Sequence, residues 1–310
     1  MRWFLSSTGK LPYRMKARKE FFDELKKLQL HNDVMKEIIL VHEGVKPLTR
    51  IMLPQSQLKS FQEFLREYGF YIAESGYKVI SKRDRGKGGW RNKILRIVSA
   101  DSREGDPFYY IAKSEEIAEE AKAAEFLSSD KSGQLLGYPE CCQKFFKKYF
   151  TLADEKQCDF VLYTLSETRE DYPYDFYNNN ASRYFGYSLL SHFPCSFNCK
   201  ESSSLAKSYY DVLKKYSKEW ADMFLYWQRS AIIYTEYRGV FLLKNFELDG
   251  NVLRYGDSYW PYSTIINENL HILNRADNIL INSKNNFSAR KGERVLKNFK
   301  GENVGLMIFG

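Results

Sequence analysis

Leu136-Gly-Tyr-Pro-Glu-Cys-Cys142 and His192-Phe-Pro-Cys-Ser-Phe-Asn-Cys199 are the two stretches on which the interpretation of this chain depends. They contain four of the five cysteines, and about fifty residues separate them. In a reducing compartment, clustered cysteines are more often metal ligands or reactive thiols than disulfides. The sequence contains no phosphate-binding loop, hydrolase elbow or metalloprotease helix. It therefore predicts chemistry only at these thiols, as a split metal or iron–sulfur site.

The second motif has the more diagnostic spacing. If Pro194 begins a helix, as proline often does, Cys195 and Cys199 lie one turn apart on the same face, and both sulfurs can reach one metal centre. A helix N-terminus also lowers the pKa of a thiol. Structural zinc sites usually have the shorter C-x2-C spacing, although C-x4-C occurs. The spacing therefore favours an iron–sulfur cluster, with zinc as the alternative.

The first motif has a similar arrangement, since Pro139 is expected to begin a helix with two thiols in its first turn. Adjacent helical residues differ by about 100° in direction, so these two thiols are not expected to reach a single ion in the same way. A larger cubic cluster tolerates the difference better. The predicted ligands are Cys142, Cys195 and Cys199, with Cys141 either a fourth ligand or a redox partner. Three thiolates on a [4Fe–4S] cluster would leave one iron open to act as a Lewis acid.

Other residues in and near the motifs have competing interpretations. His192 is a fourth ligand, a proton donor or a structural histidine, and together with Cys141 it is predicted to be catalytic. Glu201 could act as an acid or base near a cluster, but a surface charge is the simpler interpretation. Cys158, which belongs to neither motif, is interpreted as a small buried hydrophobic residue.

Three further residues are predicted to contact substrate. Tyr174 and Arg183 belong to a tract of interleaved polar and aromatic residues between the motifs, which forms either a substrate wall or a packed loop. Ser202 begins a serine tract that either binds an anionic group or forms a polar turn.

The basic, glycine-rich segment Lys82–Lys93 is compatible with phosphate contacts and base stacking, or with a solvated turn. The residues that suggest such contacts are Arg85, Lys87, Trp90, Arg91 and Lys93. The net charge of +8 favours anionic partners without specifying nucleic acid. Weak nucleic-acid binding is therefore a secondary hypothesis.

Hydrophobic periodicity predicts an α+β protein. It has a small mixed sheet layer at the N-terminus, a mainly helical cysteine-motif region in the centre, and strands at the C-terminus. We expect two domains, residues 1–112 and residues 113–310. Helices are predicted at 14–28, 57–68 and 115–126, and strands at 36–42, 49–53, 70–73, 77–81, 94–98, 108–111, 231–235, 240–245 and 252–255. The last two strands are expected to form a hairpin through Asp249-Gly-Asn251.

The 310 residues are 44% hydrophobic, enough for one large core or two smaller ones. The longest apolar runs, such as Ile38–Val41, are far shorter than the roughly 20 residues of a membrane-spanning helix. Only three apolar residues, Trp3–Leu5, precede Ser6, which is too short for a secretory signal core of about 7–15 residues. We therefore expect a cytoplasmic protein that does not associate with membranes.

The two cysteine motifs resemble the signature of a prokaryotic cysteine-motif family, domain of unknown function 483. The resemblance covers roughly residues 133–206 and does not extend to the N-terminal region. It implies that the two motifs belong to one site, and it names no reaction.

Two functional hypotheses follow from the sequence. In the first, the chain is an iron–sulfur metalloenzyme, a lyase or group transferase that acts on a small anionic metabolite. In the second, a zinc ion stabilises a non-catalytic nucleic-acid-binding protein. Colour separates them, because an iron–sulfur protein is brown and a zinc protein is colourless.

Overall fold

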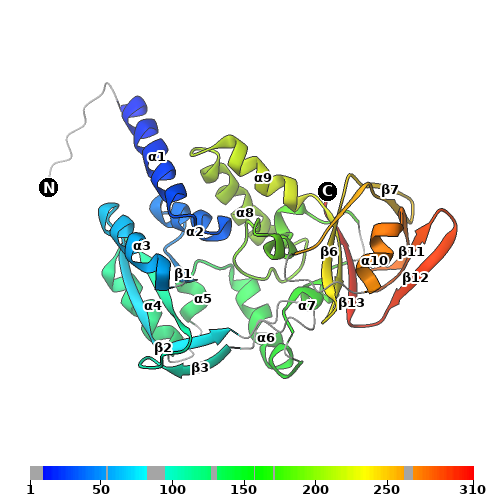
Figure 1. Cartoon of the computed structure of the whole chain (residues 1–310), viewed down its shortest axis with the longest axis horizontal. Helices are drawn as coiled ribbons and strands as arrows, with labels where there is room; N and C mark the ends of the chain where they lie inside the picture. The colour runs from blue at the N-terminus through cyan, green and yellow to red at the C-terminus, as the bar shows by residue number, and fades with distance from the viewer. Residues whose placement is uncertain are drawn as a thin grey trace.

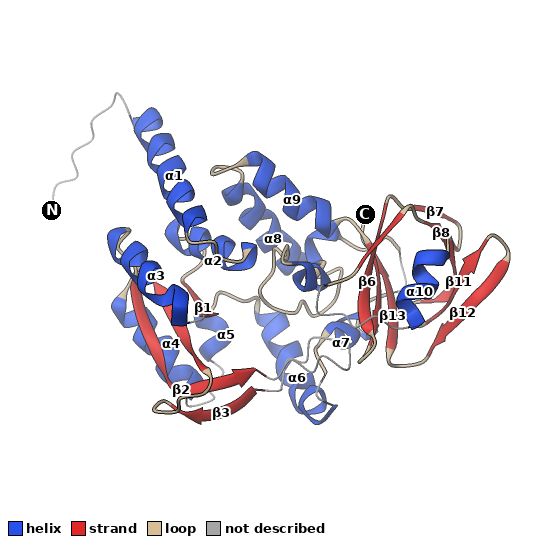
Figure 2. Ribbon diagram, in the orientation of Figure 1, coloured by secondary structure: helices blue, strands red, loops and turns tan. Residues whose placement is uncertain are grey.

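The computed structural model describes residues 10–53, 55–81, 95–126, 131–156, 158–169, 172–261 and 268–310. The predicted basic loop, Lys82–Lys93, lies outside these residues. The chain forms a mixed α+β fold with strands at both ends and helices between them, as Figures 1 and 2 show. This arrangement confirms the predicted fold class. Among the described helices, none combines the length and apolar character needed to cross a membrane.

The N-terminal part packs helices on both faces of one antiparallel sheet, with strand order β1-β4-β2-β3. Ala118 and Ala121 of α4 pack on one face, against Leu48 and Ala112. The other face shares a core with α1, α2 and α3. The elements are α1 (Lys10–Lys27), α2 (Asn32–His42), β1 (Leu48–Met52), α3 (Gln55–Glu67), β2 (Tyr71–Ser81), β3 (Leu95–Ser99), β4 (Asp106–Ala112) and α4 (Glu115–Phe126).

The central part is helical with a long irregular stretch between α7 and α8. The elements are α5 (Lys131–Leu135), α6 (Glu140–Lys156), α7 (Val161–Ser166), the 3-10 helices η1 (Phe176–Asn178) and η2 (Asn180–Phe185), α8 (Lys200–Leu213) and α9 (Lys218–Gln228). Residues Tyr209 and Phe224, from α8 and α9, belong to the same hydrophobic core as α1 and α2. The helical centre and the N-terminal layer therefore share apolar packing.

The C-terminal part contains two antiparallel sheets, with strand orders β13-β5-β6-β9 and β12-β11-β10-β8-β7. Ile233 and Phe241 of the first sheet share a core with the second sheet, whereas Ile232 and Leu242 face the central region. Burial on both faces explains why β5 and β6 are continuous apolar runs. The elements are β5 (Ala231–Thr235), β6 (Gly239–Lys244), β7 (Glu247–Asp249), β8 (Val252–Arg254), β9 (Asp257–Tyr259), α10 (Glu268–Arg275), β10 (Asn278–Ser283), β11 (Asn286–Lys291), β12 (Arg294–Lys300) and β13 (Val304–Ile308).

Three element predictions are wrong. The predicted strand 36–42 is part of helix α2, in which every residue from Met35 to Val41 is buried. The strands predicted at 70–73 and 77–81 are one strand, β2, whose register shifts between Glu74 and Lys78. The Asp249-Gly-Asn251 turn joins β7 to β8, while β6 pairs with β5 and β9.

Candidate metal centre

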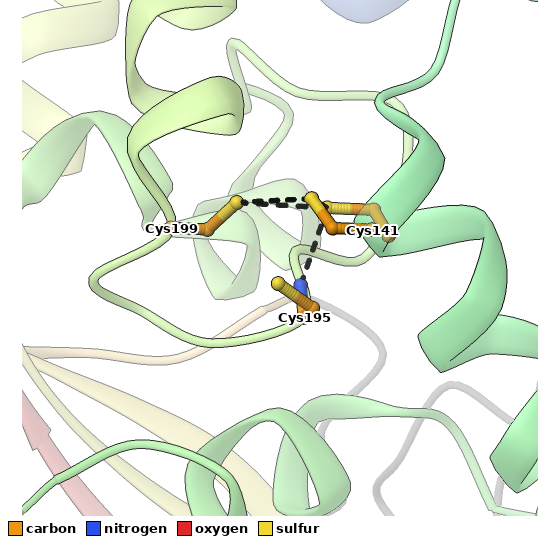
Figure 3. Close-up of side chains that lie close together, drawn as sticks. Cys141, Cys195 and Cys199 are labelled. Atoms are coloured by element: carbon orange, nitrogen blue, oxygen red, sulfur yellow. Dashed lines mark hydrogen bonds between the residues drawn. The ribbon is translucent and has the colours of Figure 1, made fainter.

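Cys141, Cys142, Cys195 and Cys199 form one cluster in which all four sulfur atoms lie within 4.8 Å of one another. The Sγ atom of Cys141 is 3.7 Å from those of both Cys142 and Cys199, and the last two are 3.8 Å apart. Figure 3 shows the side chains of Cys141 and Cys199 pointing toward one another, with Cys195 beside them. The structure thus brings both motifs to one place, and the group could hold a metal ion.

Each motif reaches the cluster through different local structure. Cys141 and Cys142 lie in the first turn of α6, where the Pro139 carbonyl accepts the Cys142 N–H at 3.0 Å. Cys199 is the N-terminal capping residue of α8, with an extended backbone. Cys195 lies in an irregular loop, so the prediction of a helix beginning at Pro194 is wrong.

Polar side chains from earlier in the chain hold that loop in its irregular conformation. Thr164 Oγ1 donates to the Pro194 carbonyl at 2.9 Å, and Thr168 Oγ1 accepts the Phe197 N–H at 2.9 Å. The amide of Asn178 donates to the carbonyls of Phe197 and Cys199 at 3.1 and 2.9 Å. These bonds satisfy backbone groups that a helix would otherwise pair. The loop is therefore fixed by contacts that do not involve the thiols.

The sulfur atoms have their own polar contacts. The Cys195 N–H donates to Cys142 Sγ at 3.3 Å. Ser202 Oγ lies 3.1 Å from Cys142 Sγ and 2.8 Å from His192 Nε2. His192 is therefore held by the Ser202 hydroxyl, which stands between its ring and the cluster. The exposed carboxylate of Glu201 accepts from Cys199 Sγ at 3.5 Å, so this residue also lies at the site.

The crowding of four thiols opposes their ionisation. Contacts with Cys195 and then Cys199 hold the pKa of Cys142 far above its usual range, and burial raises the pKa of Cys141. The pKa of Cys199 is instead lowered, because Cys142 and then Cys195 stabilise its thiolate. Without a cation, the cluster therefore favours one thiolate among neutral thiols. A bound divalent cation would favour deprotonation of all four.

Cys141 and Cys142 are adjacent in the sequence, yet both can reach one metal ion. A tetrahedral ion takes its ligands from different directions, so side chains that leave a helix in different directions can both reach it. Cys141 thus lies where a fourth ligand would lie. Cys158 is buried and lies outside the four-cysteine group.

The three predicted substrate residues occupy different surroundings. Tyr174 is fully buried, and its ring packs against Phe197 and Phe309. Ser202 is also fully buried, between Cys142 and His192. Arg183 is half-buried, and its guanidinium lies over the ring of Phe193, which belongs to the second motif.

A buried charged network beside the site was not anticipated from the sequence. Glu37 accepts from Lys46, Thr49 and Ser191, while Lys36 donates to the carbonyl of Ser188 at 2.6 Å. The Glu37 carboxylate forms salt bridges with both lysines: Lys36 Nζ lies 3.2 Å from Oε1, and Lys46 Nζ contacts Oε2. Burial with Lys46 nearby lowers the pKa of His192 to about 3, so that ring is neutral. The only sequence signal was a pair of charged residues at the start of an apolar run.

Comparisons of the chain with protein-family models, curated proteins and solved structures gave no match.

Proposed function

We propose that the four cysteines bind one tetrahedral zinc ion and that this ion stabilises the central region of the fold. The observation that carries the proposal is the set of sulfur separations, 3.7 to 3.8 Å among Cys141, Cys142 and Cys199. A zinc ion with zinc–sulfur bonds of about 2.3 Å has tetrahedral edges of about 3.8 Å. The thiols therefore have the spacing that a single ion needs.

The same spacing argues against the [4Fe–4S] cluster that the sequence favoured. In such a cluster each thiolate binds a different iron, so the sulfurs stand outside a cube and are farther apart than the edge of one tetrahedron. Four thiolates around a single ion also leave no open position for substrate, which is typical of structural zinc sites. We therefore assign the metal a structural role rather than the Lewis-acid role expected for a lyase or transferase.

The proposed ion would join three segments of the chain. Cys141 and Cys142 come from the first turn of α6, Cys195 comes from the loop, and Cys199 comes from the start of α8. The resemblance of the motifs to the family of domain of unknown function 483 supports the same grouping, and we propose membership on those motifs alone. A reducing compartment such as the cytoplasm would keep the thiols free for the metal.

Elemental analysis of anaerobically purified protein tests the proposal. We expect one zinc per chain, no acid-labile sulfide and no brown colour. Replacing Cys141, Cys142, Cys195 or Cys199 singly with serine should strongly reduce the zinc content, while Cys158→Ser, a matched cysteine outside the cluster, should retain it. Four irons with sulfide would refute the mononuclear site. Loss of zinc in the Cys158 variant, or its retention in the Cys141 variant, would refute the ligand set.

The nucleic-acid part of the second hypothesis depends on Lys82–Lys93, which lies outside the described residues, so it stays a prediction. If this segment contacts phosphates, RNA affinity falls steeply with salt, and neutralising Arg85, Lys87, Arg91 and Lys93 lowers the slope by about one unit per lost contact. Salt-independent or absent binding would contradict it.

A further inference from the structure

The four clustered thiols differ in their access to solvent. Cys141 and Cys195 are half-buried, and the other two are buried. The exposed carboxylate of Glu201 lies 3.9 Å from Cys141 Sγ and 3.5 Å from Cys199 Sγ, so both sulfurs lie at the edge of the cluster that faces solvent. A small oxidant can therefore reach Cys141 without unfolding of the protein.

The geometry of the cluster decides which thiol can pair with Cys141. Cys142 lies only 3.7 Å away, but the two residues are consecutive in the first turn of α6. Consecutive Cα atoms are about 3.8 Å apart across a trans peptide, whereas disulfides need roughly 4.4–6.8 Å. Cys199 Sγ is also 3.7 Å from Cys141 Sγ, and Figure 3 shows these two side chains pointing toward one another. Cys141 and Cys199 are therefore the pair that a disulfide would join.

Contacts other than the thiols hold this pair together. Asn178 donates to the Cys199 carbonyl at 2.9 Å and so positions the start of α8. On the other side, Phe145 of α6 is buried in the same apolar core as Phe197 of the loop. Loss of a bound metal therefore leaves Cys141 beside Cys199, and a disulfide between them needs little movement of the backbone.

We propose that the metal centre is a peroxide-sensitive switch, in which oxidation of Cys141 leads to a disulfide with Cys199 and releases the zinc. The inference rests on the proposed function, because the bound metal keeps the thiols deprotonated and its release is the response. Cys141 then has both of the roles that the sequence leaves open, fourth ligand and redox partner.

The reaction has two steps. The Cys141 thiolate attacks one oxygen of hydrogen peroxide, the O–O bond breaks, and a sulfenic acid forms while the other oxygen leaves as hydroxide and is protonated to water. The Cys199 thiolate then attacks the Cys141 sulfur, the S–S bond forms, and the S–O bond breaks with loss of a second water after protonation. Two thiolates are oxidised by two electrons in total, and the peroxide is reduced to two waters.

The metal leaves as a consequence of this reaction. Only Cys142 and Cys195 remain as thiolates, and two protein ligands do not complete a structural zinc site. The two thiolates take up protons when the zinc departs. Because the pair stays in place, reduction of the disulfide by a dithiol restores four ligands, and the site can be loaded again.

Peroxide treatment of the zinc-loaded full chain tests the proposal. A chromogenic chelator measures the released zinc, and alkylation of the free thiols before mass spectrometry, with fragment spectra, locates the disulfide. We expect complete loss of the zinc together with one disulfide, Cys141–Cys199. Zinc content should be fully regained after treatment with dithiothreitol and resupply of zinc. Cys158→Ser, which changes the cysteine outside the cluster, should behave like the parent.

Two ligand variants separate the accessible thiols and are compared with the metal-free parent. Cys195→Ser should still form the disulfide, because it keeps both members of the pair. Cys141→Ser removes the thiol that reacts with peroxide, so Cys199 should stay reduced. Oxidation of Cys199 in the Cys141 variant at the rate of the metal-free parent would show that another thiol reacts first, and would overturn the assignment.

Zinc content is measured on every sample before oxidation, so that the two proposals can fail separately. Zinc that stays bound at a peroxide concentration that fully oxidises free glutathione overturns the switch and leaves the metal centre intact. A disulfide that includes Cys142 or Cys195 overturns the assigned pair. A chain purified without zinc that still forms the Cys141–Cys199 disulfide refutes the metal centre alone. Zinc content that is not regained after reduction refutes a reversible switch.

Discussion

Asn178→Ala should weaken metal binding although Asn178 does not contact a thiol. Its amide donates two buried hydrogen bonds, to the carbonyls of Phe197 and Cys199. The lost bond to Cys199 costs about 1 kcal/mol, because that carbonyl still accepts the Ser203 N–H at 3.0 Å, whereas the Phe197 carbonyl is left unpaired at a cost of about 1–3 kcal/mol. The Oδ1 atom has no hydrogen-bond partner among the described residues, so its removal offsets part of the loss. We expect the free energy of unfolding to fall by about 1–3 kcal/mol.

The same substitution releases the loop that positions Cys195 and Cys199. Residues that hold metal ligands in place typically change metal affinity by about 10–100-fold when they are replaced. We expect a loss of at least tenfold in zinc affinity, measured by competition with a coloured chelator, while urea denaturation followed by circular dichroism gives the stability.

Asn179→Ala is the matched control for this experiment. The neighbouring amide also donates two buried bonds, to the Gln228 carbonyl at 2.7 Å and to Ser230 Oγ at 3.2 Å, and its Oδ1 accepts the Ser182 N–H at 3.2 Å. None of these partners belongs to the cysteine loop. The Asn179→Ala variant should lose at least as much stability as Asn178→Ala and keep the parent zinc affinity. Equal zinc affinity in the two variants would refute the claim that Asn178 acts through the loop.

Three further predictions follow from the described contacts. Ser202→Ala should lower zinc affinity about tenfold, because its hydroxyl supports Cys142 and His192, while cobalt-substituted protein keeps the spectrum of a four-thiolate site; a changed spectrum would make Ser202 or His192 a ligand. Burial raises the pKa of Asp159 in the folded protein to about 7. The neutral carboxyl therefore stabilises the folded state fully below about pH 4, and this stabilisation is lost as the pH rises through 7. Asp159→Asn should therefore reduce the fall in unfolding free energy between pH 4 and 8, by at most about 4 kcal/mol, and identical pH profiles would contradict this. Gly305→Ala should destabilise the fold by about 1–3 kcal/mol, since a Cβ there would lie 2.5 Å from Leu165 Cδ2, and a thermal unfolding temperature equal to that of the parent would exclude the clash.

The cysteine cluster was predictable because its residue types carry the chemistry. The C-x3-C spacing after Pro194 predicts a helix, and this prediction is wrong, because the second motif forms an irregular loop. Phe197 N–H bonds to Thr168 and the Pro194 carbonyl to Thr164, partners about thirty residues earlier in the chain. Such long-range bonds leave no local pattern, so a proline in front of C-x3-C looks like a helix start.

The predicted strand at 36–42 failed for another reason. A short apolar run such as Ile38–Val41 fits a buried strand or a fully buried helix equally well, because neither shows a polar face. Even the charged residues that open the run, Lys36 and Glu37, are buried in the helix. Only the surrounding core, contributed by α1, α8 and α9, decides between the two structures.

The pairing of β13 bears on the order in which the chain assembles during its synthesis. β13 follows every other described strand, yet it pairs with β5, and Tyr174 from between the cysteine motifs bonds to the Ile308 carbonyl at its end. All four cysteines are therefore synthesised well before β13, the strand that completes the sheet β13-β5-β6-β9. Pairing between distant segments is slow compared with the formation of local helices. If the thiols bind metal as proposed, loading during this interval would protect them from modification before the sheet is complete.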